Sequence, residues 1–337
     1  MNFKRFLRRI GTPAAIGSSL RPLLTWPFLL LAAVIVALTL AGMRYTFHQQ
    51  KDKEIARFQA IADLKVSQIA AWFEERHGDA QLLHGSRFLA DLYQRWRSAG
   101  DPAIRDPRSA IRDPRSAIRE QLRQWLDEHR QVDRYQNALL FDEQGEPALM
   151  AIDAPLRVTP ELRATVQRAI AEGRVLNTGL YRSGDDPGML SLDFVAPLPA
   201  LSGQAGPAVV LRVDPKAALY PMIQSWPFPS ASAETVLFRH DGDQALFLSP
   251  LRHQPDAALQ LRLPVAESRL LAAQILRGDV APDSVVEGVD YRQASAMGVG
   301  KAIPGTDWFL LAKLDRNELY APALRDRSEE RRVGKEC

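Results

Sequence analysis

Cysteine is almost absent from this chain of 337 residues, which holds a single one, Cys337, at its end. A disulfide scaffold and thiolate metal or redox sites are therefore excluded, because both need cysteines in the body of the protein. The chain must fold on its hydrophobic core alone. With 46% hydrophobic residues, it has enough length and apolar content to bury one.

A basic surface for nucleic acid is also missing, although the formal net charge is +3. Residues 1–43 hold five basic side chains and no acidic one, so the rest of the chain is mildly acidic. Because that remainder has no stripe of Lys and Arg, we expect no nucleic-acid partner.

Catalytic and cofactor motifs are lacking as well. No H-E-x-x-H and no G-x-S-x-G sequence occurs. The stretch "GVGK" at 298–301 is not a phosphate loop, because Ser295 replaces its first glycine and Ala302 its Ser or Thr. His77 and His84 lie two helical turns apart, a poor spacing for a metal. The sequence therefore predicts no catalytic residue, no metal and no cofactor.

One long apolar run is present at residues 23–43, which hold 21 residues without a charge. At about 1.5 Å per residue, a helix of this length spans a hydrocarbon core of about 30 Å. A cleaved signal peptide would have a shorter apolar region and a small-residue cleavage site, so we expect a retained transmembrane helix. The basic residues 1–22 then stay in the cytoplasm as a tail, and residues 44 onward lie outside, periplasmic or extracellular.

A helical periodicity follows this run. Apolar residues recur at steps of three and four, and no proline occurs from residue 44 to 101. The pattern predicts one long stalk helix over residues 44–98, with Ile55, Ile69 and Trp72 buried. A helix of this length needs a partner for its apolar stripe, either the following domains or a second copy of the chain.

A tandem duplication comes next. The heptapeptide AIRDPRS occurs at 103–109 and again at 110–116. Pro107 and Pro114 exclude a continuous helix, and extra length costs little in an exposed loop. We therefore expect residues 99–120 to form a loop.

A weaker repeat organises the second half of the chain. "LLFDEQGEPALM" from Leu139 and "VLFRHDGDQALF" from Val236 align without gaps, and each reads as a β-hairpin around a glycine. "VVLRVD" and "LLAKLD", which end at Asp214 and Asp315, recur in the same order as apolar strands. A helical stretch lies between hairpin and last strand in each copy, at 159–172 and at 265–277.

This repeat predicts two related units of α+β class. We place them at residues 121–222 and 223–324, and each should be a small antiparallel sheet with helices. Superposition of the two units should bring Gly145 onto Gly242.

Three stretches carry a resemblance to a known family. They are "LKVSQIAAWFEERHGDAQLL" (64–83), "SWPFPSASAETVLFRHDGDQALFLSPLRHQPDAALQLRLPV" (225–265) and "IPGTDWFLLAKLDRNELYAPAL" (303–324). Together they resemble the double-Cache, or tandem PAS-like, sensor region of bacterial transmembrane receptors. The resemblance implies one transmembrane helix, a stalk helix and two tandem PAS-like antiparallel-sheet units. Residues 121–222 would be the membrane-distal unit and residues 223–324 the membrane-proximal one.

The same resemblance implies a function in signal transduction. The chain would be the ligand-sensing input region of a histidine kinase or diguanylate cyclase of the bacterial inner (cytoplasmic) membrane, as in two-component systems. A small molecule of unknown identity would bind the distal unit, and shifts of about 1–2 Å between packed helices would pass the signal on. The resemblance also implies a parallel homodimer along the stalk helix.

The last residues, "RSEERRVGKEC" at 327–337, differ from the rest of the chain. They read as translated sequencing-adapter DNA, so we expect them to be an artefact. The receptor would then be truncated before its second membrane helix and its cytoplasmic output domains.

Two other functions stay open at the level of the sequence. The first is a membrane-anchored periplasmic binding or interaction protein without an output of its own, which the downstream reading frame would distinguish. The second is a hydrolase outside the cytoplasm, which requires converging acid and base groups. Carboxylates such as Asp185 and Asp186 instead lie beside glycine and proline, as in surface turns.

The candidate ligand site lies on two strands of the first unit. In "MLSLDFVA" (189–196), alternation turns Ser191 and Asp193 away from the core, and in "VLNTGLYR" (175–182), Asn177 and Tyr181 share a face. If the strands pair, these four residues line one polar pocket floor. The carboxylate would receive an amine, and the tyrosine ring would cover it. A solvated sheet face is the alternative.

The resemblance bears on the ligand as well. Cache domains that bind amino acids use an aspartate on a late strand, as Asp193 is here. They also carry an Arg-x-Trp-Tyr stretch upstream, which residues 121–180 lack. This departure weighs against an amino-acid ligand.

Overall fold

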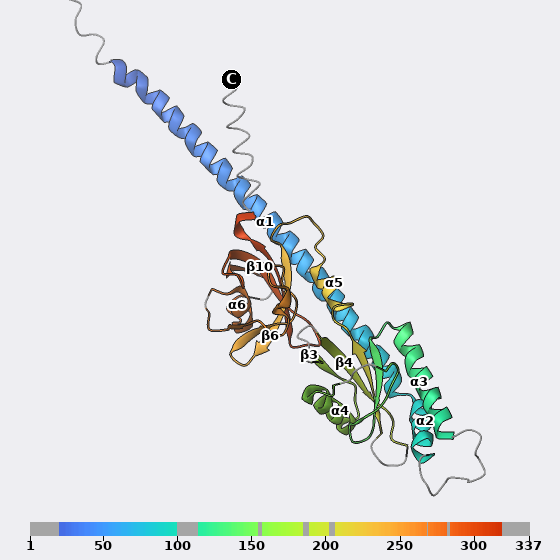
Figure 1. Ribbon diagram of the computed structural model, residues 1–337. Coiled ribbons are helices and arrows are strands. Elements are labelled where there is room, and N and C mark those ends of the chain that lie inside the picture. Colours follow the sequence, from blue (N-terminus) through green and yellow to red (C-terminus); the bar gives the residue numbers. More distant parts are fainter. Residues whose placement is uncertain are drawn as a thin grey trace, which may run out of the picture. The chain divides into compact units, whose positions relative to one another are not determined.

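The computed structural model describes residues 20–99, 114–153, 157–184, 189–201, 206–267, 269–281 and 284–318. Within them the chain is α+β, with two antiparallel sheets (Figure 1). Contacts group residues 57–324 into one compact unit that contains both sheets, and the remaining residues form a second unit.

The helices are α1 (Leu20–His84), α2 (Arg87–Ser98), α3 (Pro114–Val132), α4 (Pro160–Glu172), α5 (Leu219–Gln224) and α6 (Leu271–Arg277), with a 3₁₀ turn at Pro255–Ala257. The strands of the first sheet are β1 (Asn137–Phe141), β2 (Pro147–Met150), β3 (Leu176–Arg182), β4 (Leu190–Pro197) and β5 (Ala208–Val213). Those of the second sheet are β6 (Glu234–Asp241), β7 (Gln244–Phe247), β8 (Arg262–Pro264), β9 (Val285–Val289), β10 (Ser295–Ala302) and β11 (Trp308–Asp315).

The stalk consists of two helices rather than one, so the single helix expected over residues 44–98 is wrong. α1 ends at His84, and Ser86 has an extended backbone with φ −77° and ψ 91°. The Ser86 hydroxyl accepts a hydrogen bond from the backbone N–H of Leu89 at 3.3 Å, the bond that an N-cap serine makes to start a new helix. Of the residues expected to be buried, Ile69 is buried, whereas Ile55 and Trp72 are half-buried.

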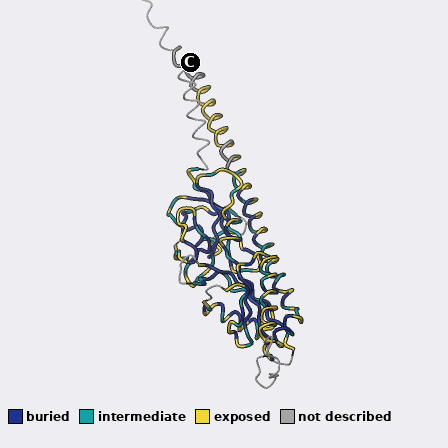
Figure 2. Tube along the Cα trace, turned by 45° about the vertical axis from the view of Figure 1, so that its right-hand side comes forward, coloured by how far each residue is buried: buried dark blue, intermediate teal, exposed yellow. Residues whose placement is uncertain are grey.

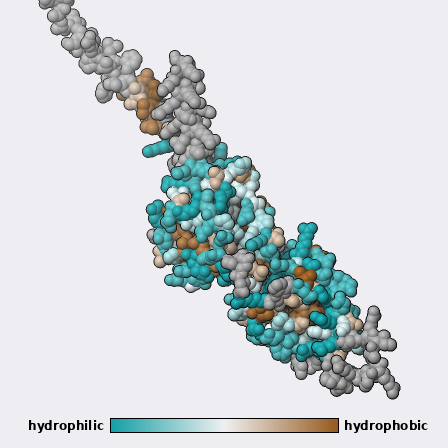
Figure 3. Space-filling view, in the orientation of Figure 1, coloured by the Kyte–Doolittle hydropathy of each residue, from teal (hydrophilic) through white to brown (hydrophobic). Residues whose placement is uncertain are grey.

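The apolar run forms the first part of α1, and its side chains are described from Leu30 onward. They are exposed, and they appear yellow in Figure 2 and largely brown in Figure 3. The described residues contain no helix that is both long and apolar enough to count as a membrane span. The side chains of residues 23–29, which belong to the expected transmembrane helix, lie outside the described ones.

Other expected segments fall outside the described residues in whole or in part. These are the basic tail up to residue 19, residues 100–113 of the expected loop, and the tail over 327–337. The last part of the expected loop is wrong, because α3 begins at Pro114 within the duplication. Proline lacks a backbone N–H and is well tolerated in the first turn of a helix.

The two sheets have corresponding strand orders. The first is β2-β1-β5-β4-β3, and the second is β8-β7-β6-β11-β10-β9. With β8 set aside, each strand of one sheet has a counterpart in the other, as the internal repeat predicts. Gly145 and Gly242 sit in the turns of the two corresponding hairpins, and both have positive φ, 81° and 63°.

Helices cover both faces of the sheets. Residues of α1 belong to a buried cluster that includes strands of both sheets, whereas α4 and α6 pack on the opposite faces (Figure 1). Phe73 of α1 joins the two sheets directly. Its ring centroid lies 6.0 Å from that of Phe194 on β4 and 5.1 Å from that of Trp308 on β11.

Candidate ligand site

β3 contains a bulge that decides where its side chains lie. Asn177 lies opposite Phe194, and Leu180 lies opposite Leu192, so β3 has one residue more than β4 between these pairs. Gly179 lies inside the bulge with φ +66°, a conformation that glycine adopts without strain.

The extra residue reverses the alternation of β3. Asn177 therefore faces the same side as Phe194, toward α1, whereas Tyr181 packs in the cluster beneath α4. The expectation that Asn177 and Tyr181 share a face is wrong for this reason. The condition that the two strands pair is met, because β3 and β4 are neighbours and Tyr181 lies opposite Ser191.

Three of the four expected residues come together on the α4 face of the sheet. Tyr181 is 5% exposed, Ser191 is 1% exposed and Asp193 is fully buried. Ser191 donates a hydrogen bond to the hydroxyl of Ser183 at 2.8 Å, and Tyr181 donates one to the carboxylate of Asp193. These groups are buried rather than a solvated sheet face.

Arg212 on β5 completes this cluster, and the sequence reasoning missed it. It lies directly opposite Asp193 in the β4–β5 register. Its Nε donates to Oδ1 of Asp193 at 3.0 Å, and its Nη2 donates to Oδ2 at 2.9 Å. Nη2 also donates to the Tyr181 hydroxyl at 2.7 Å. Both oxygens of the Asp193 carboxylate are thus occupied by groups of the chain itself.

The electrostatics keep the guanidinium of Arg212 charged. Burial opposes the charge of Arg212, but the Asp193 carboxylate beside it outweighs burial and raises the pKa of the guanidinium. Burial, followed by the same carboxylate, raises the pKa of the Tyr181 phenol, which therefore stays protonated. The cluster of Tyr181, Asp193 and Arg212 then has no net charge.

The second sheet carries a related cluster on the face covered by α6. Lys313 on β11 is 1% exposed, and its Nζ lies 2.8 Å from Oδ2 of Asp290 and 3.2 Å from Oε2 of Glu234. The hydroxyl of Tyr291 donates to Oε2 of Glu234 at 3.1 Å. A buried cation, carboxylates and a tyrosine hydroxyl therefore recur in both units.

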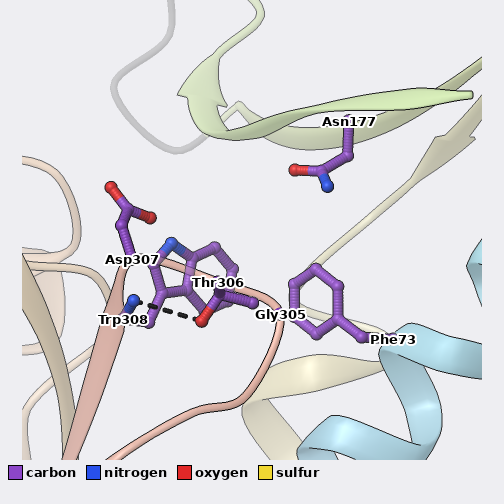
Figure 4. Close-up of a pocket in the computed structure, with 6 residues that line it drawn as sticks. All are labelled: Phe73, Asn177, Gly305, Thr306, Asp307 and Trp308. Atoms are coloured by element: carbon purple, nitrogen blue, oxygen red, sulfur yellow. Dashed lines mark hydrogen bonds between the residues drawn. The ribbon is translucent and has the colours of Figure 1, made fainter. Parts of the chain in front are cut away.

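Asn177 lines a separate cavity on the other side of the first sheet (Figure 4). The cavity has a volume of about 340 Å³ and is lined by Phe73 of α1, Asn177 of β3, residues 305–307 between β10 and β11, and Trp308 at the start of β11. A further cavity of about 300 Å³ lies between α1, α3 and β5, with His129 and Asp133 among its lining residues. No cluster of three or more His, Cys, Asp or Glu suited to a metal ion is found in the part of the chain that the structure describes.

Comparisons with known proteins identify the fold. No protein-family model and no curated protein matches the chain. Among solved structures, the sensory domain of the Campylobacter jejuni chemoreceptor Tlp3 with isoleucine bound matches with a TM-score of 0.54 at 11% identity, covering 82% of this chain and 98% of that one. The same domain in complex with L-valine gives 0.53 at 10% identity, with the same coverage.

A third structure agrees with these two. The ligand-binding domain of the Pseudomonas fluorescens chemoreceptor CtaA in complex with L-serine matches with a TM-score of 0.50 at 13% identity, covering 79% of this chain and 99% of that one. The resemblance to a double-Cache sensor region is confirmed at the level of the fold. This chain therefore shares the fold of the sensory and ligand-binding domains of these bacterial chemoreceptors.

Proposed function

We propose that the chain is the ligand-sensing input region of a receptor in the bacterial inner membrane. The fold supports this function, because the Tlp3 and CtaA structures that share it are sensory or ligand-binding domains of chemoreceptors. The apolar run over residues 23–43 supports the membrane anchor. The basic N-terminal tail then stays in the cytoplasm, and residues 44 onward lie in the periplasm.

The buried pair of Asp193 and Arg212 is the observation that carries the ligand site. Burying two charges costs desolvation energy, and well-packed apolar residues often serve stability as well. A buried pair therefore suits a switch, in which one partner is exchanged for a ligand. Asp193 lies in the middle of β4, between β3 and β5, beneath α4.

The exchange defines the chemistry of the ligand. Both oxygens of Asp193 accept hydrogen bonds from Arg212, so a ligand ammonium group that takes over these positions displaces the guanidinium. The released guanidinium can then pair with an acceptor on the same ligand. The Tlp3 and CtaA structures contain isoleucine, valine and serine, each of which carries both groups. A small molecule with an ammonium group is therefore the proposed ligand, and amino acids are the first to test.

Movement of Arg212 has a direct path to α1. Arg212 lies on β5, and the chain runs from β5 into α5. Lys65 of α1 is buried and donates hydrogen bonds to the backbone carbonyl of Met222 and, at 2.5 Å, to Oγ of Ser225, at the end of α5. We propose that a displacement of β5 reaches α1 through this contact, and the membrane through α1.

Titration calorimetry on the full chain in mild detergent tests the ligand site. The panel contains amino acids, primary amines without a carboxylate, and carboxylates without an amine. We expect ammonium-bearing compounds to bind, and Tyr181→Phe to weaken their binding by about fivefold, since it removes the hydrogen bond from the Tyr181 hydroxyl to Asp193, worth about 1 kcal/mol. Tyr181→Phe leaves the buried ion pair intact, so it is expected to fold.

The isosteric variant Asp193→Asn gives the decisive comparison. It removes the charge that receives the ammonium group, so binding should be lost, with folding checked by circular dichroism. A ligand that binds wild type and Asp193→Asn equally would take Asp193 out of the site. If Asp193→Asn does not fold, the affinity of Tyr181→Phe relative to wild type still tests the site, and equal affinities would contradict it.

The homodimer along α1 is also part of the proposal. Leu64 and Leu82 of α1 are 53% and 78% exposed, which leaves apolar side chains for a second copy. In a parallel dimer, identical residues of the two helices face each other. With Cys337 replaced by serine, Leu64→Cys should therefore form a disulfide-linked dimer in membranes under mild oxidation. Absence of this dimer with both Leu64→Cys and Leu82→Cys argues against a parallel arrangement.

A further inference from the structure

The cavity that contains Asn177 lies where the two sheets meet. Its walls come from four parts of the chain. Phe73 belongs to α1, Asn177 to β3, residues 305–307 to the turn between β10 and β11, and Trp308 is the first residue of β11. At about 340 Å³ it falls in the lower range of small-molecule sites. It is separate from the Asp193 cluster, which lies on the opposite face of the first sheet.

Trp308 presents a donor without a partner to this cavity. The residue is 2% exposed, and its backbone N–H donates to the hydroxyl of Thr306 at 3.1 Å. Its indole Nε1 makes no hydrogen bond with any residue that the structure describes. Figure 4 shows the nitrogen on the edge of the ring that faces the cavity. This nitrogen is not among the buried polar atoms without a partner, so it is open to the cavity, where a ligand or solvent atom can accept its hydrogen bond.

Asn177 presents a second donor. Its Oδ1 accepts a hydrogen bond from the backbone N–H of Gly179 at 3.0 Å, which fixes the orientation of the amide. The Nδ2 group then has no partner among the described residues, and the side chain points from β3 into the cavity (Figure 4). The bulge at Gly179 creates this site, because without it Asn177 would face α4.

The rest of the lining is apolar or already paired. Thr306 donates to the carbonyl of Ile303 at 3.0 Å, and Asp307 at the rim accepts from Nη1 of Arg239 at 3.1 Å. The ring of Phe73 supplies an apolar wall. The cavity thus offers two N–H donors beside an aromatic surface, and its one carboxylate is balanced by an arginine.

We propose that this cavity is a second small-molecule site, which takes a planar carboxylate or carboxamide head on an apolar body. The oxygens of the head accept hydrogen bonds from Nδ2 of Asn177 and Nε1 of Trp308, and the body packs against Phe73. A ligand bound here touches both sheets and α1 at once. It therefore stabilises the junction of the two units, since any ligand specific for the folded state does so.

Three probes of similar size test the head group: phenylacetate, phenylacetamide and phenethylamine. The full chain is labelled with ¹⁵N-tryptophan in detergent, and the indole resonance of Trp308 is assigned with Trp308→Phe. We expect phenylacetate and phenylacetamide to shift this resonance in a saturable manner, while phenethylamine leaves it in place. An amine bound at Asp193 does not disturb this readout, because the resonance reports on Trp308 alone.

A matched pair of variants tests the role of Asn177. Asn177→Asp keeps the oxygen that accepts from Gly179 but replaces the donor with a carboxylate, and it should weaken phenylacetate by at least fivefold. Asn317→Asp makes the same change at an exposed position and should leave the affinity unchanged. If neither oxygen-bearing probe moves the Trp308 resonance, if all three move it equally, or if Asn177→Asp binds phenylacetate as wild type does, the proposal is overturned.

Discussion

Arg212 and Lys313 occupy equivalent positions in the two sheets. Each lies on the strand of its sheet that comes last in the sequence, two residues before Asp214 or Asp315. Each is buried in an ion pair. Their carboxylate partners come from different places. Arg212 pairs with Asp193, which lies opposite it on β4. Lys313 lies opposite Gly298 on the equivalent strand β10, so its partners are Glu234, opposite it on β6, and Asp290, which follows β9. The two units therefore share the cation but not the origin of its partner.

Removal of Arg212 should destabilise the protein strongly. Arg212→Met leaves the carboxylate of Asp193 buried without its cation, a change that costs about 3–5 kcal/mol in comparable cases. Adding Asp193→Asn removes the uncompensated charge and should recover at least half of the loss. Urea denaturation of wild type, both single variants and the double variant measures these differences. A single Arg212→Met variant as stable as wild type would show that the pair contributes nothing.

Acid should weaken the second unit through Asp290. Burial opposes the charge of Asp290, but hydrogen bonds from Arg292 and Lys313 outweigh it and lower the pKa of the carboxyl. As the pH falls below the ordinary value of about 3.9, the unfolded chain therefore takes up a proton before the folded chain does. Asp290 therefore makes its full contribution to the free energy of unfolding above that pH. The contribution is lost as the pH falls through the lowered pKa of Asp290. Asp290→Asn should flatten this decline in urea titrations repeated across the acid range.

Replacement of Phe73 should lower stability strongly, because its ring contacts both sheets. Phe73→Ala opens a cavity between α1, Phe194 and Trp308 and should cost about 3–5 kcal/mol. Phe88 on α2 is 56% exposed, so Phe88→Ala should change stability by less than about 0.5 kcal/mol. Thermal unfolding of both variants makes the comparison, and similar melting temperatures would contradict it.

Two glycines should respond in opposite directions to the same substitution. Gly78 lies inside α1, and a Cβ added there meets no atom within 4 Å, so Gly78→Ala should stabilise the protein by up to about 1 kcal/mol. At Gly288 on β9, a Cβ would lie 2.1 Å from the carbonyl oxygen of Arg269. Gly288→Ala must therefore displace backbone and should lower the melting temperature.

Much of the fold could be predicted from the sequence because its signals are local. The glycines of the two hairpins mark turns that need positive φ, and apolar runs ending in Asp214 and Asp315 mark the two last strands. The break in the stalk also had a local signal, since Gly85 and Ser86 are a helix stop followed by an N-cap residue. The uninterrupted apolar periodicity and the absence of proline over residues 44–101 favour one continuous helix in spite of that signal.

The site could be predicted only in part. Alternation correctly places Ser191 and Asp193 on one face of β4, because β4 is regular, but it does not show that α4 buries this face. Alternation fails for Asn177, because the bulge arises from the pairing of β3 with β4. The sequence of β3 alone does not show where the extra residue lies. Arg212 had a usable signal, because a cation in the middle of the apolar stretch "VVLRVD" needs a buried partner. Which carboxylate meets it depends on the register between β4 and β5.

The bulge has a consequence for how two ligands would influence each other. Because of the bulge, side chains on opposite faces of the edge strand β3 reach the two sites. Asn177 lines the cavity where the two sheets meet, and Tyr181 contacts the buried ion pair. A ligand in the cavity and a ligand at the ion pair would therefore both contact β3. Any ligand that shifts β3 from one side alters the affinity on the other side, and thermodynamic reciprocity requires the two effects to be equal in magnitude.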